Sequence, residues 1–183
     1  DWSNAALWLA AGAVGTAPVT VTGLDMNSPQ GDRRIVDVLR QFGATVTVDG
    51  DTVTVAPAPL RGICLNASQI PDLVPILAVA ASVAEGETVI HGASRLRLKE
   101  SDRLSTVAAM LTALGISVQE LSDGLLVTGG TFSGGTVDGA NDHRIVMAAA
   151  IAATACSAPV TILGAEAVSK SYPDFWEEYQ RLG

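Results

Sequence analysis

The sequence predicts an α/β (α+β) fold in which repeated βαβαββ units surround buried parallel helices with pseudo-threefold symmetry. Two observations predict it. An Ala-rich segment, a short turn and a strand of β-branched residues ending in Gly occur three times along the chain. Each copy is followed by a polar loop and a second helical pattern, and the first two copies continue into an alternating hairpin pattern. Strands that alternate with helices are typical of helices packed on sheets.

The three copies align without gaps through the helix, the turn and the strand. They end at Gly23, Gly92 and Gly164, so the second copy is offset from the first by 69 residues and the third from the second by 72 residues. The first copy lacks its opening strand, and the third stops after its second helix. We therefore predict a single domain over residues 1–183, with repeats at approximately 1–57, 58–129 and 130–183.

The opening segments predict helices that are buried on every side. They are the most apolar stretches of the chain, at residues 5–14, 73–84 and 145–155. Each is shorter than the ~20 residues of a membrane span, although the mean hydropathy of the chain is +0.35. A helix that is apolar all round is typical of a protein core. We expect the three helices to pack together at the centre, and we expect no membrane association.

The second half of each repeat carries helix and turn signals. An Asp stands near the end of each polar loop, at Asp32, Asp102 and Asp174, where it is placed to cap the helix that follows. Gly43 and Gly115 stand where a glycine commonly ends a helix. The alternating segments ATVTVDGDTVTVAP and ISVQELSDGLLVTG each contain an Asp-Gly turn and predict two hairpins.

The composition argues against several classes of function. A formal net charge of −8 and a pI of about 4.5 disfavour a nucleic-acid partner, because phosphate backbones are bound by basic faces. His91 and His143 are the only histidines, and neither they nor Cys64 and Cys156 follow a metal-ligand spacing. We interpret the two cysteines as reduced core thiols of a cytoplasmic protein. No metal and no cofactor is expected.

Cations are scarce, and their positions are informative. The chain has two lysines, Lys99 and Lys170, and the repeat places them in equivalent loops. The segment RLRLKESDR, residues 95–103, gathers three arginines around Lys99. A strand there would put Arg95, Arg97 and Lys99 on one face. The alternative for this segment is a solvated loop with internal ion pairs, and the alternative for Lys170 is an ordinary surface lysine.

The starts of the three central helices form the predicted site. If the helices are parallel, their N-termini emerge on one face, where helix dipoles and free N–H groups favour anions. The alignment makes Ser3, Asp72 and Arg144 equivalent. Asp72 and Asp142 are also open to a helix-capping interpretation. Arg144 opposes the dipole and would be unfavourable there without an anion. Cations and carboxylates converging in this way suit an anionic substrate and acid–base chemistry.

The segments LKESDRL, NDHRIVMA, SKSYPDFW, SQIPDLVPILAVAA and NSPQGDRR resemble the 5-enolpyruvylshikimate-3-phosphate (EPSP) synthase family, in that family's order and over essentially the whole chain. The resemblance implies the carboxy-terminal half of a two-domain enolpyruvyl transferase fold. It further implies transfer of the enolpyruvyl group of phosphoenolpyruvate to the 5-hydroxyl of shikimate 3-phosphate, with release of phosphate and without metal or cofactor. The implied partners are these two substrates and a missing amino-terminal domain, in a monomeric cytoplasmic enzyme of aromatic amino acid biosynthesis that is a glyphosate target.

The resemblance also assigns residue roles. Asp72 matches the carboxylate beside the 5-hydroxyl, the proposed base. Glu100 matches the carboxylate proposed to relay a proton at C3 of phosphoenolpyruvate, and Lys99 matches a shikimate-phosphate-site lysine close to both reactants. The division of the proton steps between Asp72, Glu100 and the lysines stays open. Because this chain has half of the cleft, we predict that it folds alone without measurable turnover.

The remaining matches are cations that hold phosphoenolpyruvate. Bidentate arginine suits carboxylate and phosphate geometry. These matching residues are Arg103, Arg144 and Lys170, with His143 beside them. Some family members carry an Asn four residues before the lysine, where it touches the shikimate moiety. This chain has Arg95 at that position, so that contact is not transferred.

Three alternatives remain at this stage. UDP-N-acetylglucosamine enolpyruvyl transferase shares the chemistry and the fold, but the KESDR and NDHR motifs favour the shikimate enzyme. The RNA 3′-phosphate cyclase-like group has related repeats, and the net charge of −8 argues against it. The third alternative is a non-catalytic domain of the same fold, against which the retention of both carboxylates and every matched cation argues.

Overall fold

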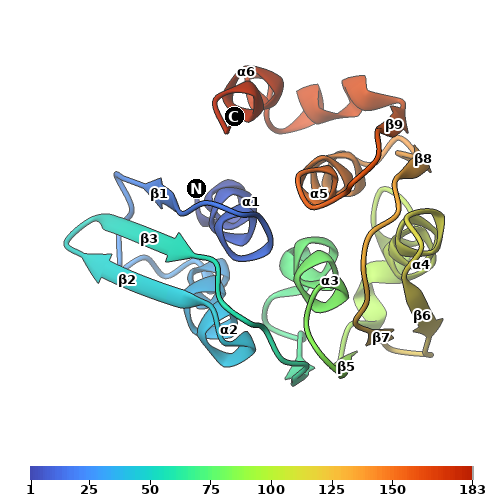
Figure 1. Cartoon of the computed structure of the whole chain (residues 1–183), viewed down its shortest axis with the longest axis horizontal. Helices are drawn as coiled ribbons and strands as arrows, with labels where there is room; N and C mark the ends of the chain where they lie inside the picture. Colours follow the sequence, from blue (N-terminus) through green and yellow to red (C-terminus); the bar gives the residue numbers. More distant parts are fainter. Residues whose placement is uncertain (183) are drawn as a thin grey trace.

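A computed structural model of the chain describes residues 1–182 and confirms the predicted α/β architecture (Figure 1). The first repeat contains these elements: α1 (Trp2–Val14), β1 (Val19–Val21), η1 (Gly31–Arg34), α2 (Ile35–Phe42), β2 (Thr45–Asp49) and β3 (Thr52–Ala56). The second contains these: β4 (Cys64–Asn66), η2 (Pro71–Leu73), α3 (Val74–Ser82), β5 (Glu87–His91), η3 (Ser94–Leu98), α4 (Arg103–Ala113), β6 (Ser117–Glu120) and β7 (Leu125–Thr128). The third contains these: β8 (Gly135–Asp138), α5 (His143–Ala153), β9 (Val160–Leu163), η4 (Ala165–Lys170) and α6 (Phe175–Gln180). The η elements are short 3₁₀ helices.

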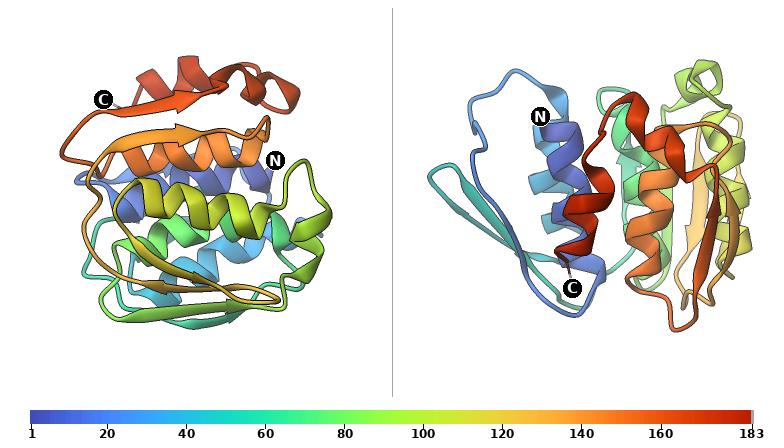
Figure 2. Two further views of the ribbon diagram at one scale, coloured as in Figure 1. Left: turned by 90° about the vertical axis from the view of Figure 1, so that its right-hand side faces the viewer. Right: turned by 90° about the horizontal axis from the view of Figure 1, so that it is seen from above.

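The three Ala-rich helices form the core of the molecule. Figure 1 looks nearly along α1, α3 and α5, which lie together in the middle, and Figure 2 shows them running side by side. Every residue of α3 is buried, as are all residues of α1 except Asn4 and all residues of α5 except Arg144 and Ala153. Alanine lets the three backbones approach closely while still removing apolar surface from water. The prediction of a central three-helix core is therefore confirmed.

Three small sheets surround this core, and each draws its strands from one repeat. Their strand orders are β1–β3–β2, β4–β5–β7–β6 and β8–β9. The parallel pair β4–β5 aligns Cys64 with Val89, and the parallel pair β8–β9 aligns Thr136 with Thr161. Both residues of the second pair lie 72 positions after those of the first. The sequence repeat is therefore also a repeat of strand register.

The repeats differ in how many strands they contribute. The outer edge of β5 is covered by β4, but β1, which occupies the equivalent place in the first sheet, pairs with β3 alone among the described strands. In the third sheet β9 is the equivalent of β5. Among the described strands β9 pairs with β8 alone, whereas β5 pairs with β7 as well as with β4. One edge of β1 and one edge of β9 are thus left without a strand neighbour within residues 1–182.

The predicted helix caps are right at one position, partly right at a second and wrong at a third. Asp102 caps α4, because its carboxylate accepts a hydrogen bond from the Ser105 N–H at 3.3 Å. Asp174 occupies the cap position of α6, but its side chain makes no capping bond. Asp32 does not cap α2. It lies inside η1, and its side chain turns inward, where it is buried.

The glycine and hairpin predictions are confirmed. Gly43 ends α2 with a φ of 108°, and Gly115 follows α4 with a φ of 86°. Both angles lie in the left-handed region that glycine adopts without a steric penalty. The antiparallel pairs β2–β3 and β6–β7 are the two hairpins, and the first turns through Gly50 and Asp51.

The cysteine prediction is wrong for one of the two residues. Cys64 is exposed on β4, an edge strand of its sheet, because its side chain is on the outward face of the pleat. Cys156 is partly buried, and burial raises the pKa of its thiol. Neither thiol forms a disulfide. Among the described residues, no helix combines the length and the apolar character needed to cross a membrane.

Candidate active site at the start of the central helices

Asp72 lies at the centre of the predicted site, in the 3₁₀ turn that leads into α3. Its carboxylate is not a helix cap, and the capping interpretation is wrong. Instead Oδ1 accepts a hydrogen bond from Arg103 Nη1 at 3.1 Å. Lys99 Nζ lies 3.8 Å from the same oxygen, and Arg144 Nη2 lies 3.9 Å from Oδ2. Three of the predicted cations therefore converge on one carboxylate.

Arg103 is the most enclosed residue of the site. It is the first residue of α4, and its side chain is 2% exposed. Besides Asp72, it binds Glu100, where Nη2 lies 2.5 Å from Oε2, and Asp142, where Nε lies 2.9 Å from Oδ2. An arginine buried among carboxylates is stable only when its donors are matched in this way.

Asp142 connects Arg103 to the start of α5. Its carboxylate is completely buried, caps α5 by accepting from the Arg144 N–H at 3.0 Å, and accepts from the Ser101 hydroxyl at 2.8 Å. Burial alone would raise the pKa of Asp142, but the hydrogen bonds from Arg103 and Ser101 hold it below its ordinary value. The capping interpretation of Asp142 is right but incomplete, because Asp142 also binds Arg103, which no sequence pattern indicated.

Arg144 and His143 contribute unsatisfied polar atoms. The Arg144 side chain is 14% exposed, yet its Nε has no hydrogen-bond partner among residues 1–182, and the same holds for Nδ1 of His143. Buried polar atoms are nearly always satisfied in folded proteins. The positive charge of Arg144 is unfavourable at the N-terminus of α5, as predicted. The carboxylate of Asp72, 3.9 Å from its guanidinium, offsets part of this cost.

His143 is held in its neutral form. Burial, followed by the nearby charges of Arg144 and Arg103, lowers the pKa of His143 below its ordinary value of 6.5.

We expect the imidazole resonances of His143 to titrate below pH 6.5 when followed by NMR, with His143→Gln as the assignment control. The unfolded chain then binds this proton more readily than the folded one, so stability should fall as the pH drops from 6.5 toward the lowered pKa. A midpoint at or above 6.5 would contradict the burial seen here.

Lys170 joins the site from the third repeat. Its Nζ donates to the backbone carbonyl of Asn141 at 2.6 Å, directly before the Asp142 cap. Lys170 is the last residue of η4, and the segment that follows it is held by aromatic packing, because Trp8 stacks on Phe175 with ring centroids 5.2 Å apart. Trp8 Nε1 also donates to the Tyr172 hydroxyl at 3.0 Å. Lys170 is exposed, and this hydrogen bond places its amino group beside the start of α5.

The first repeat brings a buried carboxyl to the same face. The Ser3 hydroxyl donates to Asp32 at 2.5 Å, and the amide of Gln30 donates to Ser3 Oγ at 3.0 Å. Burial raises the pKa of Asp32 above its ordinary value, which the hydrogen bond from Ser3 only partly offsets. The sequence identified Ser3 as the equivalent of Asp72 but gave no sign of this pairing with Asp32.

Of the two interpretations of residues 95–103, a strand or a solvated loop, the strand is wrong. Residues 94–98 form the 3₁₀ helix η3, in which alternate residues do not share a face. Arg95 reaches the carbonyl of Ser68 instead, and Arg97 binds Asp102 and Glu120. Of the three cations predicted to lie together, Lys99 alone contacts the Asp72 carboxylate. The alternative of internal ion pairs describes Arg97, whereas Arg95 binds a backbone carbonyl.

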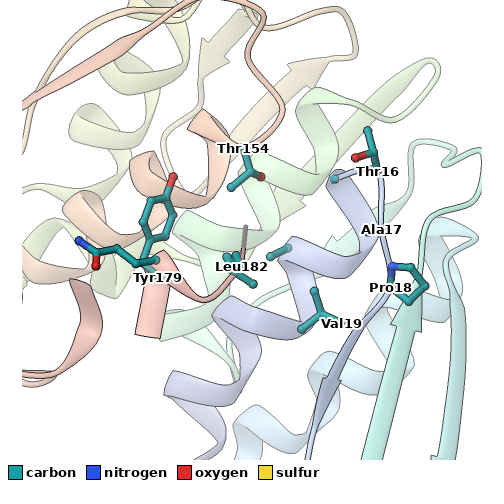
Figure 3. A pocket seen from close by; sticks show the side chains of 10 residues that line it. Thr16, Ala17, Pro18, Val19, Thr154, Tyr179 and Leu182 are labelled. Atoms are coloured by element: carbon teal, nitrogen blue, oxygen red, sulfur yellow. The ribbon is translucent and has the colours of Figure 1, made fainter. Parts of the chain in front are cut away.

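A cavity of about 410 Å³ lies at the other end of the central helices (Figure 3). It is bounded by the C-terminal ends of α1 and α5 and by α6, with Thr16, Thr154 and Tyr179 in its wall. Ser3 and Thr16 are separated by most of the length of α1, roughly 20 Å at 1.5 Å per residue. None of the predicted site residues lines this cavity.

Comparisons with known proteins show which family the chain resembles. The model of the EPSP synthase family (3-phosphoshikimate 1-carboxyvinyltransferase) matches residues 1–179. Curated relatives named 3-phosphoshikimate 1-carboxyvinyltransferase include those of Clostridium novyi, 45% identical, and Pyrococcus abyssi, 47% identical. Each alignment covers 100% of this chain, and they cover 42% and 44% of these relatives. The chain therefore spans less than half the length of the curated relatives it matches.

Solved structures give the same result. EPSP synthase from Acinetobacter baumannii superimposes with a TM-score of 0.87 at 32% identity, over 99% of this chain and 45% of that one. The enolpyruvyl transferase NikO from Streptomyces tendae superimposes with a TM-score of 0.75 at 26% identity, over 100% of this chain and 43% of that one. With the family match over residues 1–179, these likenesses show that the chain belongs to the EPSP synthase family.

Proposed function

We propose that this chain forms half of the active site of an enzyme that transfers the enolpyruvyl group of phosphoenolpyruvate to the 5-hydroxyl of shikimate 3-phosphate, releasing phosphate. One observation carries the proposal. Two carboxylates and four cations from different repeats meet where the central helices begin: Asp72, Glu100, Lys99, Arg103, Arg144 and Lys170. Both substrates are anions, and the reaction needs proton transfer, so this set of groups suits its chemistry.

The carboxylates are the candidates for proton transfer. In this proposal Asp72 accepts the proton of the attacking 5-hydroxyl, and Glu100 relays a proton to C3 of phosphoenolpyruvate. Their side chains are 36% and 42% exposed, so each can reach a substrate in an open cleft. Lys99, held 3.8 Å from Asp72, is placed to bind the shikimate phosphate near both reactants. Separate substitution of Asp72 and of Glu100 tests the roles of the two carboxylates.

The cations are the candidates for holding phosphoenolpyruvate. Arg103, Arg144 and Lys170 supply the positive charge in this proposal, with neutral His143 beside them. Arg144 lies 3.9 Å from Asp72, which is too long for a hydrogen bond, so a substrate anion can take its donors without breaking one. The unsatisfied Arg144 Nε and His143 Nδ1 within residues 1–182 also support a ligand at this position.

We further propose that residues 1–183 act as one domain of three repeats, at approximately 1–57, 58–129 and 130–183. The confinement of each sheet to one repeat supports these limits. The chain spans 42% of its relative from C. novyi, so the rest of such a protein is proposed to complete the cleft as an amino-terminal domain. Transition-state stabilisation depends on positioned groups that exclude water, so half of a cleft should not suffice.

An NMR titration of the chain with each substrate tests the proposal. We expect no measurable turnover by this chain alone, and resonance shifts with shikimate 3-phosphate or phosphoenolpyruvate at Asp72, residues 99–103, Arg144 and Lys170. UDP-N-acetylglucosamine is the control ligand and should give no shifts. Shifts with the UDP-sugar alone would transfer the assignment to the other branch of enolpyruvyl transferases. Robust turnover by the chain alone would refute the half-site proposal.

A further inference from the structure

The three carboxylates that bind Arg103 differ sharply in their exposure to water. The side chain of Asp142 is 0% exposed, whereas those of Asp72 and Glu100 are 36% and 42% exposed. Arg103 itself is 2% exposed. The guanidinium thus has an inner partner sealed in the protein and two outer partners that reach the open face of the site.

The inner partner has no freedom to leave. Asp142 binds two donors of Arg103, Nε at 2.9 Å and Nη2 at 3.2 Å, and also accepts from Ser101 and from the Arg144 N–H. A carboxylate fixed by four hydrogen bonds at a helix start orients the planar arginine fork that it binds. The direction in which the rest of the guanidinium points is therefore set by Asp142.

The outer partners occupy the donors that a substrate would need. Glu100 takes Nη2 and Asp72 takes Nη1. Lys99 and Arg144 also lie against Asp72, so the three carboxylates and three cations of the cluster balance in charge, and the outer carboxylates compete with any further anion for Arg103. An anion that replaces one of these carboxylates at Arg103 releases it into water, and each of them is more than a third exposed already.

We propose that Asp142 is a positioning residue that fixes Arg103, and that Glu100 and Asp72 are exchangeable counter-ions which an anionic substrate displaces. The inference rests on the proposed function in naming that anion as phosphoenolpyruvate. Its arrival releases Glu100 from Arg103, so the carboxylate proposed to relay a proton at C3 becomes available only when the substrate is bound. Substrate binding and proton delivery are coupled through a single guanidinium.

The affinity of the full-length enzyme for phosphoenolpyruvate tests this, measured by calorimetry in the absence of shikimate 3-phosphate so that no turnover occurs. Glu100→Gln removes a competing charge, so binding should tighten roughly two- to fivefold, the size of a half-exposed ion pair. Glu120→Gln is the matched control, because Glu120 pairs with Arg97 outside the site, and it should leave the affinity unchanged. Unchanged or weaker binding by Glu100→Gln would overturn the exchange model.

The inner carboxylate should give the opposite sign. Asp142→Asn keeps an acceptor for the cap but loses the charge that orients Arg103, so phosphoenolpyruvate affinity should weaken roughly tenfold, the size of one charge-assisted hydrogen bond. Shikimate 3-phosphate affinity should hold, whereas a general loss of structure would weaken both. Equal loss for both ligands would overturn the positioning role. If Asp142→Asn does not fold, the Glu100→Gln measurement decides the inference.

The inference and the proposed function fail in different ways. If the wild-type enzyme makes no product, the proposed function itself fails. If it turns over and Glu100→Gln does not tighten binding, only this inference fails.

Discussion

Replacing Asp72 by Asn, or Glu100 by Gln, should lower kcat of the full-length enzyme by roughly 10²–10⁴, the range for a positioned acid or base. Each substitution keeps the shape of the side chain and removes its ability to exchange a proton. Neither carboxylate caps a helix, and each is more than a third exposed. Steady-state kinetics with both substrates measures the effect.

The melting temperature separates this role from a structural one. Both variants should unfold within a few degrees of the wild type, because exposed ion pairs contribute about 0–1 kcal/mol. Glu120→Gln, which removes an equally exposed carboxylate from the Arg97 pair, should change neither kcat nor the melting temperature. A collapse in melting temperature with kcat retained would assign Asp72 or Glu100 to the scaffold instead.

Replacing Arg103 by Met should lower the free energy of unfolding by about 3–5 kcal/mol, the cost of breaking a buried ion pair from one side. Methionine is similar in length to the arginine stem and removes the charge. The fully buried Asp142 is then left with a negative charge and only the Ser101 hydroxyl and the Arg144 N–H to stabilise it. Chemical denaturation of the two proteins measures the difference.

Two further variants isolate the buried charge as the cause. Arg97→Met removes an arginine that is 31% exposed and should cost about 0–1 kcal/mol. Adding Asp142→Leu to Arg103→Met removes the stranded charge and should recover part of the loss. A single variant Arg103→Met as stable as the wild type would contradict the buried pairing.

The loss of stability caused by Arg103→Met should also depend on pH. Arg103 and Ser101 hold the pKa of Asp142 below its ordinary value of 3.8. The stabilisation from this carboxylate is therefore complete above pH 3.8 and is lost as the pH falls through the lowered pKa. The gap in stability between the wild type and Arg103→Met should narrow in that acidic range.

The repeat made most of the fold predictable from sequence. Three copies of one pattern predicted three buried helices, and the 72-residue offset is preserved in the pairing of β4–β5 and β8–β9. Hydrophobic periodicity and turn residues are local signals, so helices, strands and turns can be predicted from them without knowledge of tertiary contacts. The predictions that went wrong depended on where single side chains point.

The site illustrates that difference. The sequence left Asp72 open to a capping interpretation, because an acidic residue beside Pro71 suits a first helical turn. In the structure its carboxylate accepts a hydrogen bond from Arg103 instead, which is 31 residues away in sequence. Alternation predicted a shared face for Arg95, Arg97 and Lys99, and the tighter 3₁₀ turn removed it. The bond between Asp142 and Arg103 joins the third repeat to the second. No local sequence pattern shows how two repeats are placed in space.

The edges of β1 and β9 that have no strand neighbour within residues 1–182 bear on how the chain behaves in solution. A bare strand edge is a template on which another polypeptide can add itself, and it favours self-association at high concentration. Both strands are β-branched, and Leu163 at the end of β9 is 53% exposed. The isolated chain is therefore expected to self-associate at millimolar concentration. A lysine substituted on the exposed edge of either strand should reduce this association.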